Sequence, residues 1–352
     1  MPSADAAQRH SPSRPLSQRG RVIRRYGAPL HFEDCKRMIA TAIERKDLER
    51  QIALVLTTAV DPAKGLFGPN SITWRVNREA VLFLAAGRAL LLQLAHPWIA
   101  EAIADHSRTM LDPLGRFHRT FSIMFSIIFG TLDQALAAAR KLHERHAQIT
   151  GTMGEGAGPF AKGSSYLANE LNALQWVSAT LTETSVVAYE LVLPTLSEGE
   201  RQRYYSESKS IAALFGLPPA FLPNDWKAFM SYNEEMWRSD VLTVTPTARA
   251  IADGVLWQGG RWPRIPKWYR AVTALLLPPL LREGFRLSYG SAEQKSAEDT
   301  LKWFRRMHGV LPGSIRFVGP YHEAVERLLG RPRPRLRTQM LNRLWIGRSA
   351  LD

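Results

Sequence analysis

The chain has 352 residues, 45% of them hydrophobic and 22% charged, which is typical of a globular protein with a large buried core. Its one cysteine, Cys35, excludes an internal disulfide framework, a four-cysteine zinc site, a thiolate-bound iron–sulfur cluster and the C-x-x-C-H attachment of c-type haem. A single thiol also fits a reducing compartment.

The net charge of +14 is concentrated at the two ends of the chain. Residues 1–30 hold six arginines against one aspartate, and residues 327–352 hold seven against one, so the ends supply 11 of the 14 charges. A nucleic-acid-binding domain would carry this excess on a folded face, so no nucleic-acid partner is expected. We predict a disordered basic arm over 1–30 and a basic tail over 331–352, both disordered termini whose expected contact is an anionic membrane or a partner protein.

No apolar run reaches the roughly 18 residues of a membrane-spanning helix. Arg88 interrupts the run 80–99, and Pro278 and Pro279 interrupt the run that starts at Ala271. The N-terminus has arginines but no apolar h-region, so we expect no Sec signal peptide. The predicted location is the cytoplasm, with peripheral membrane association through the basic termini.

Apolar residues recur at helix spacing along most of the chain, and strand-like alternation is nearly absent. Glycine-rich and proline-rich segments predict loops at 61–70, 151–163 and 216–224. The predicted fold class is all-α, with a single multi-helix, bundle-like domain over residues 31–330. Helices are expected over 32–58, 77–96, 97–107, 114–128, 132–150, 166–191, 197–214, 225–239, 246–256, 266–289, 292–309, 321–329 and, weakly, 336–347.

The stretch 116–151 is the strongest candidate for a functional site. Arg116 and Arg119 precede a charge-free apolar segment that runs from Thr120 to Leu132. An alanine-rich helix with two histidines follows it. Two cationic side chains and two histidines thus bracket a long apolar wall, which is what a buried, flat and anionic cofactor such as haem requires.

The two histidines, His143 and His146, share one face of the predicted helix but point about 60° apart. Both can line a pocket, yet only one can lie over a haem iron. Ala147 and Ile149 give His146 an apolar setting, whereas charged neighbours predict a more exposed His143. The spacing alone leaves open that both are ordinary surface histidines.

Arg116 can share a helix face with Arg119 or with Thr120. Guanidinium groups at these positions can hold haem propionates, or donate hydrogen bonds to bound oxygen or to a carboxylate. The alternative is a solvated start of a helix. The apolar run that follows argues against that alternative, because it must be buried.

Several other catalytic centres lack their motifs. No histidine has a glutamate three residues before it, which excludes the paired Glu-x-x-His of a ferritin-like di-iron site. The chain also has no H-E-x-x-H zinc motif, no G-x-S-x-G elbow and no P-loop.

Five segments occur in a recognisable order: FGPNSITWRVNREAVLFLAAGRALLLQLAHP (67–97), DHS (105–107), DPLGRFHRTF (112–121), HAQITG (146–151) and YLANELNALQWVSATL (166–181). In this order they resemble the MpaB-type oxygenases, the all-α family that includes the rubber oxygenases, or latex-clearing proteins. The resemblance covers roughly residues 65–330. It implies a non-covalent haem b, dioxygen as co-substrate, and oxidative cleavage of carbon–carbon double bonds in rubber or isoprenoid chains.

In the rubber-cleaving members an Arg-x-x-Lys-Thr step lies in the haem pocket, and a histidine downstream is the proximal ligand. The matching residues here are Arg116, Arg119, Thr120 and His146, so the resemblance makes His146 the iron ligand. Arg119 replaces the lysine and cannot be an axial ligand, since arginine stays protonated. The distal side would then be open or water-filled, with Arg119 donating to bound oxygen. Ser178 stands where relatives often have histidine, which removes a contact.

The predicted function is therefore a haem b-dependent oxygenase that cleaves or oxidises an alkene in an apolar, isoprenoid-like substrate, either a small molecule or a polymer. Arg116, Arg119 and Thr120 are the predicted catalytic residues, and His143 joins them and His146 in binding the cofactor. The alternative is a non-catalytic haem- or lipid-binding protein of the same fold.

Overall fold

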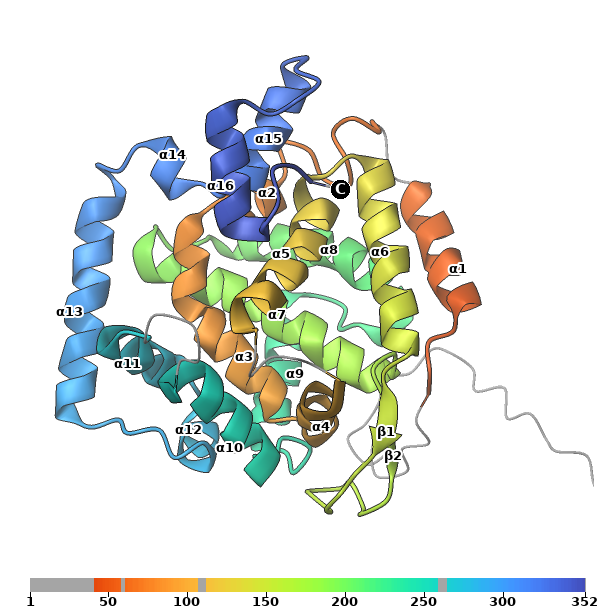
Figure 1. Cartoon of the computed structure of the whole chain (residues 1–352), viewed down its shortest axis with the longest axis vertical. Coiled ribbons are helices and arrows are strands. Elements are labelled where there is room, and N and C mark those ends of the chain that lie inside the picture. The colour runs from red at the N-terminus through yellow and green to blue at the C-terminus, as the bar shows by residue number, and fades with distance from the viewer. Residues whose placement is uncertain (1–40, 58–60, 107–111, 259–264, 352) are drawn as a thin grey trace, which may run out of the picture.

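The computed structural model describes residues 41–57, 61–106, 112–258 and 265–351, and this part of the chain is almost entirely helical (Figure 1). The all-α prediction is confirmed. The predicted arm over 1–30 lies outside the described residues. The helices are α1 (Arg45–Leu56), α2 (Ile72–Asn77), α3 (Ala86–Leu94), α4 (Pro97–His106), α5 (Pro113–Phe129), α6 (Leu132–Ala147), α7 (Leu171–Val192), α8 (Glu198–Leu214), α9 (Trp226–Arg238), α10 (Pro246–Asp253), α11 (Lys267–Leu276), α12 (Pro279–Gly284), α13 (Ser291–His308), α14 (Gly313–Arg316), α15 (Gly319–Leu328) and α16 (Leu336–Ile346), with 3₁₀ turns at Ala80–Ala85 and Pro219–Phe221 and a π turn at Gly254–Gln258.

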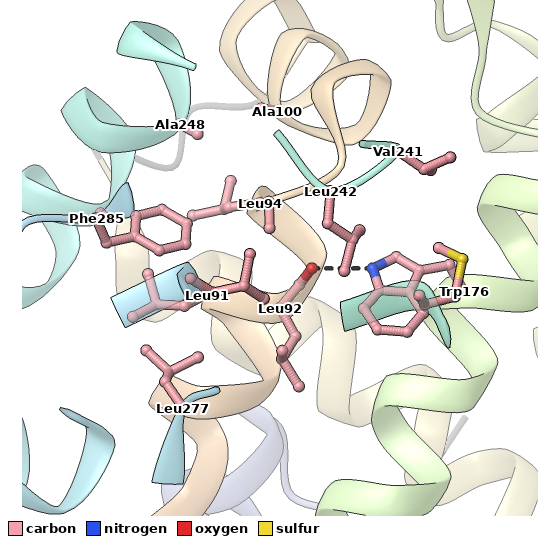
Figure 2. Packing of buried hydrophobic residues seen from close by; sticks show 14 of the residues in the cluster. Leu91, Leu92, Leu94, Ala100, Trp176, Val241, Leu242, Ala248, Leu277 and Phe285 are labelled. Atoms are coloured by element: carbon pink, nitrogen blue, oxygen red, sulfur yellow. Dashed lines mark hydrogen bonds between the residues drawn. The ribbon is translucent and has the colours of Figure 1, made fainter. Parts of the chain in front are cut away.

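The centre of the molecule is formed by α3 and α7. The indole Nε1 of Trp176 on α7 donates a hydrogen bond to the carbonyl of Leu92 on α3 at 2.9 Å (Figure 2). Leu91, Leu94 and Phe285 surround this contact in one buried cluster. A helix that is apolar on most of its circumference, as α7 is, must be covered on all sides, and the remaining helices cover it.

Arg88, which interrupts the apolar run of α3, lies in this centre and is buried together with Glu183 of α7. Its guanidinium donates to both carboxylate oxygens of Glu183 and, at 2.6 Å, to the hydroxyl of Thr184. Its Nε donates to the carbonyl of Leu276 at 2.8 Å. The charge inside α3 is therefore fully matched.

The helix predicted over 77–96 is divided into the 3₁₀ turn Ala80–Ala85 and α3. The cause is a side chain inserted into the backbone ladder. The hydroxyl of Tyr269 accepts from the backbone N–H of Gly87 and donates to the carbonyl of Phe83, both at 3.0 Å. These two groups would otherwise bond to each other in a regular helix.

The helix predicted to begin at Tyr166 begins instead at Leu171, because residues 165–167 form a strand. Strands β1 (Thr150–Thr152) and β2 (Ser165–Leu167) pair antiparallel, with Gly151 opposite Tyr166. A Cβ on Gly151 would lie 2.3 Å from the Tyr166 hydroxyl, so this position requires glycine. Gly151 therefore begins a β-hairpin, whereas we predicted only a loop over 151–163.

The weakly predicted helix over 336–347 is confirmed as α16, but the prediction of a disordered tail is wrong for residues 331–351. Helix α16 packs against α5 and α15, and Ile346 and Leu351 lie in a buried cluster with Trp74 and Phe129. The amide of Asn342 donates to Glu323 at 2.6 Å. The segment is rich in arginine, but one face of α16 is buried, which the composition alone does not show.

Among the described residues no single helix is long and apolar enough to cross a membrane. One pair of helical segments, Ala80–Leu94 and Pro97–His106, meets the length and composition criteria together, with a bend of 102° between them.

Candidate functional site at the free end of the α5–α6 hairpin

Helices α5 and α6 form an antiparallel hairpin that contains every predicted site residue. Asp112 caps α5 by accepting from the N–H of Gly115 at 2.8 Å. Thr131 caps α6 through a reciprocal pair of hydrogen bonds with Gln134. Both caps are encoded locally, so the sequence predicts the start of each helix to within one residue.

One face of each helix packs on the other near the turn. The members of this contact belong to one apolar cluster and are spaced three or four residues apart, as one helix face requires. They are Ile123 and Ile127 from α5, and Ala135, Ala139 and Leu142 from α6.

The same faces continue to the free ends of the hairpin. On α5 the face continues from Ile123 to Thr120 and Arg116, and on α6 it continues from Leu142 to His146. Residues equally distant from the turn lie opposite each other in an antiparallel pair with equal rise per residue. Counting from the Gly130–Thr131 turn places Arg116 and His146 near the free ends of their helices.

Burial decreases along this face. Ile127 is fully buried, Ile123 is half-buried and Thr120 is exposed, while Arg116 and His146 are half-buried. The apolar contact between the two helices therefore ends before their free ends, which carry the polar side chains.

A cavity of about 660 Å³ lies at the C-terminal end of α6. Its volume falls within the roughly 300–1,000 Å³ of small-molecule and cofactor sites. The lining comes from α6, from the segment just before α7 and from the segment that leads into α1. It includes His143, His146, Ala147, Leu167, Asn169 and Ile43.

His146 has the properties of a neutral, oriented imidazole. Burial, then the charges of Arg145 and of His143, lower its pKa to about 4, against a smaller opposing effect of a hydrogen bond with Asn169. The amide of Asn169 in turn donates to the carbonyl of His143 at 3.0 Å. A metal-ligating histidine needs this neutral form and a second partner that fixes its ring.

His143 is the more buried of the two histidines, with 7% of its surface exposed, whereas we predicted the reverse. Burial and, secondarily, the charge of Arg45 lower its pKa. The cause is α1, which packs on this side of α6 and brings Arg45 into contact with Glu144. Within the described residues the Nδ1 atom of His143 is buried without a hydrogen-bond partner.

The free end of the hairpin is also crowded with positive charge. Burial, followed by the charges of Arg119 and Arg145, lowers the pKa of Arg116 to about 10. Arg119 is 42% exposed and forms an ion pair with Asp112 at 3.2 Å. The charge of Arg145, the chain neighbour of His146, acts on both Arg116 and His146. Such a cluster of guanidinium groups favours an anionic ligand.

Of the four matching residues, His146 lines the cavity described above, whereas the three on α5 are not part of its lining. Arg116 and Thr120 share the face toward α6, and Arg119 lies on the exposed edge beside it. Two further residues were missed. Asn169 contacts both histidines of α6 only because the segment before α7 packs against that helix, and Arg145 is an exposed charge that acts on Arg116 and His146.

Ser178 lies away from this end of the hairpin. It is buried on α7 and lines a second cavity of about 20 Å³ with Gln175, Tyr205 and Ser208. That space suffices for about one water molecule. Ser178 therefore belongs to the interior of the α7–α8 region.

The donor set suits haem better than a bare metal ion. No group of three or more histidine, cysteine, aspartate or glutamate side chains is placed to hold a metal in the part of the chain that the structure describes. Haem iron needs one axial imidazole from the protein, and its two carboxylates need cations. His146 would be the imidazole and the arginines around Arg116 would be the cations.

The comparison with protein families gives one match. A model described as ER-bound oxygenase mpaB/B′/rubber oxygenase, catalytic domain, matches residues 74–312, which is more than half of the chain. No curated protein and no solved structure matches the chain. The matched span includes the whole α5–α6 hairpin and the cavity at its end, apart from the segment that leads into α1.

Proposed function

The chain belongs to the family of mpaB/B′ and rubber oxygenases, and from that premise we propose that it is a haem b-dependent oxygenase that uses dioxygen to oxidise or cleave an alkene in an apolar, isoprenoid-like substrate. Family membership itself gives an oxygenase catalytic domain, as the resemblance of its motifs predicted. The haem and the alkene rest on that resemblance and on the fit of the site.

The observation that carries the proposal is the neutral imidazole of His146 in the lining of a cavity of cofactor size, on the same hairpin as a cluster of guanidinium groups. The imidazole is neutral and hydrogen-bonded to Asn169, and the opposite helix presents Arg116. Haem has an iron that binds an imidazole and two propionate carboxylates that bind guanidinium groups, so it fits these residues.

Each side chain has a separate role in this proposal. His146 would hold the iron, and Asn169 would keep its ring in place. Arg116 would hold a propionate carboxylate, and Thr120 would offer a hydroxyl near the bound group. Bound haem supplies the activation of dioxygen, while the chain positions it and excludes water.

Arg119 would act at the edge of the site. Its ion pair with Asp112 fixes the guanidinium, and its charge is partly matched before any ligand arrives. This observation favours the second candidate function, a non-catalytic haem- or lipid-binding protein, because a distal donor that is already engaged polarises oxygen less. Oxygen consumption separates the two functions.

The first test is the absorption spectrum of protein purified after expression with ample haem. We expect a Soret band that His146→Ala removes and that the control His322→Ala, on α15 and outside the cavity, retains. An oxygen electrode with squalene or polyisoprene then distinguishes turnover from binding. Colourless wild-type protein, or an unchanged spectrum in His146→Ala, would overturn the haem assignment. A haem spectrum with no oxygen uptake on any alkene would favour the binding protein.

A further inference from the structure

Helix α16 presents a stripe of large apolar side chains to solvent. Leu336, Met340 and Leu344 are 79%, 68% and 63% exposed. They are spaced four residues apart, so they lie within about 80° of one another on the helix surface. Isolated exposed leucines are ordinary, but three in line on one helix form a continuous apolar strip.

Contacts on the opposite face of α16 keep the apolar stripe exposed to solvent. Thr338, Asn342 and Ile346 are buried against α15 and α5. The hydroxyl of Thr338 donates to Glu326 at 2.9 Å, and Asn342 is bound to Glu323. Because these polar contacts are buried, α16 cannot turn its apolar stripe inward without breaking them.

Arginines border the stripe on both sides. Arg343 and Arg337 lie at its two edges, and both are exposed. The connection that precedes the helix adds exposed arginines, and residues 331–351 contain no acidic residue. The additional arginines are Arg331, Arg333 and Arg335.

We propose that α16 and the connection before it dock on the surface of an anionic lipid bilayer. The leucines and the methionine enter the boundary between headgroups and acyl chains, and the arginines bind lipid phosphates. A helix with an apolar strip flanked by cations has the side-chain arrangement of an interfacial helix that lies in the membrane plane. Each basic residue near such a surface adds to the attraction.

The charge of this surface favours an anionic bilayer over a protein partner. A second copy of the chain would bring the same arginines against these and would be repelled. An acidic protein would match the arginines, but it would have to supply an apolar groove for a strip that projects outward. A bilayer offers anionic phosphates and an apolar interior at the same depth along the whole helix.

The docking surface is adjacent to the hairpin described above. The imidazole Nε2 of His118 on α5 hydrogen-bonds to the carbonyl of Leu344 at 3.0 Å, and Figure 1 shows α16 beside α5. His118 lies between Arg116 and Thr120 in the chain. If the proposed function holds, docking keeps the site close to the phase in which apolar alkenes dissolve; the docking itself does not depend on haem.

The test is co-sedimentation of the full chain with vesicles of phosphatidylcholine alone, and of equal parts phosphatidylcholine and phosphatidylglycerol. We expect binding to the mixed vesicles only. Met340→Ser with Leu344→Ser should lower the partition coefficient about tenfold per side chain. Arg337→Gln with Arg343→Gln should lower it about fivefold per arginine, and added salt should remove that difference.

Two exposed residues elsewhere serve as matched controls. Leu280 on α12 is 63% exposed, and the side chain of Arg238 on α9 is 75% exposed. Leu280→Ser and Arg238→Gln should bind vesicles as wild type does. The N-terminal arginines alone could attract anionic vesicles, so dependence on the apolar stripe is the decisive result.

Three outcomes would overturn the proposal. Wild type that stays in solution with the mixed vesicles excludes membrane docking. Stripe variants that bind as wild type does exclude α16 as the docking surface. Stripe-dependent dimerisation, or stripe-dependent binding to polyglutamate without vesicle binding, assigns the surface to a protein partner instead. Circular dichroism of each variant verifies that it is folded.

Discussion

Buried arginines have different surroundings in the centre of the molecule and at the free end of the α5–α6 hairpin. In the centre, Arg88 is buried against Glu183, Thr184 and the carbonyl of Leu276. At the hairpin end, burial lowers the pKa of Arg116, and the charges of Arg119 and Arg145 lower it further.

The difference separates a structural charge from a binding charge. A buried cation with all its donors satisfied holds two core helices in one arrangement. Like charges placed together cost stability in the free protein, and such perturbed groups cluster where a ligand supplies the opposite charge. The contrast therefore supports an anion at the hairpin end and none at the centre.

Breaking the central pair should have the largest effect. Glu183→Leu leaves the Arg88 guanidinium buried without its carboxylate, and we expect a loss of about 3–5 kcal/mol in the free energy of unfolding. Arg88→Met with Glu183→Leu should be more stable than Glu183→Leu alone, because no charge then stays buried. Urea denaturation measures both. A Glu183→Leu protein as stable as wild type would contradict the structural role of the pair.

The second prediction concerns the pH dependence of stability in the interior. Burial lowers the pKa of His96, in the interior beside Phe160, to about 4. Between pH 6.5 and 4 the unfolded chain binds a proton at His96 that the native state does not, so stability falls as pH falls through this window, by up to about 3 kcal/mol at pH 4. His96→Phe should lose less stability than wild type over this range. Equal losses in urea titrations at pH 7 and pH 4.5 would show that His96 does not contribute.

The smallest effect is expected at the hairpin end. Arg116→Leu removes one charge-assisted hydrogen bond to a carboxylate, which contributes about 1.5–3 kcal/mol, so haem affinity should fall about ten- to a hundredfold. Urea denaturation of the haem-free variant separates a lost haem contact from a lost contact within the protein. Arg140→Leu is the matched control, because Arg140 lies on the same hairpin but is bound to Glu49. Equal haem affinity in both variants would remove Arg116 from the site.

Sequence reasoning succeeded where the signal is local. The capping residues Asp112 and Thr131 act within one turn of their own backbone, so they predict where α5 and α6 begin. The family resemblance was confirmed because its motifs are short segments in a defined order. Spacing also predicted correctly that Arg116 and Thr120 share one helix face.

Sequence reasoning failed where a distant segment decides. The strand at Tyr166 exists because the chain pairs with Gly151, and the burial of His143 depends on α1. The helix near 336–347 was predicted weakly, but its packing against α15 and α5 was not. None of these contacts leaves a periodic trace in its own segment.

The sequence by itself determined the all-α class, most helix boundaries and the family, because periodicity, caps and motifs act over a few neighbouring residues. Only the tertiary structure decided which faces meet. It brought Asn169 to the imidazole of His146 and left the α16 stripe exposed to solvent. These outcomes depend on packing between segments far apart in the chain, which minimises exposed apolar surface for the whole fold and not for any one helix.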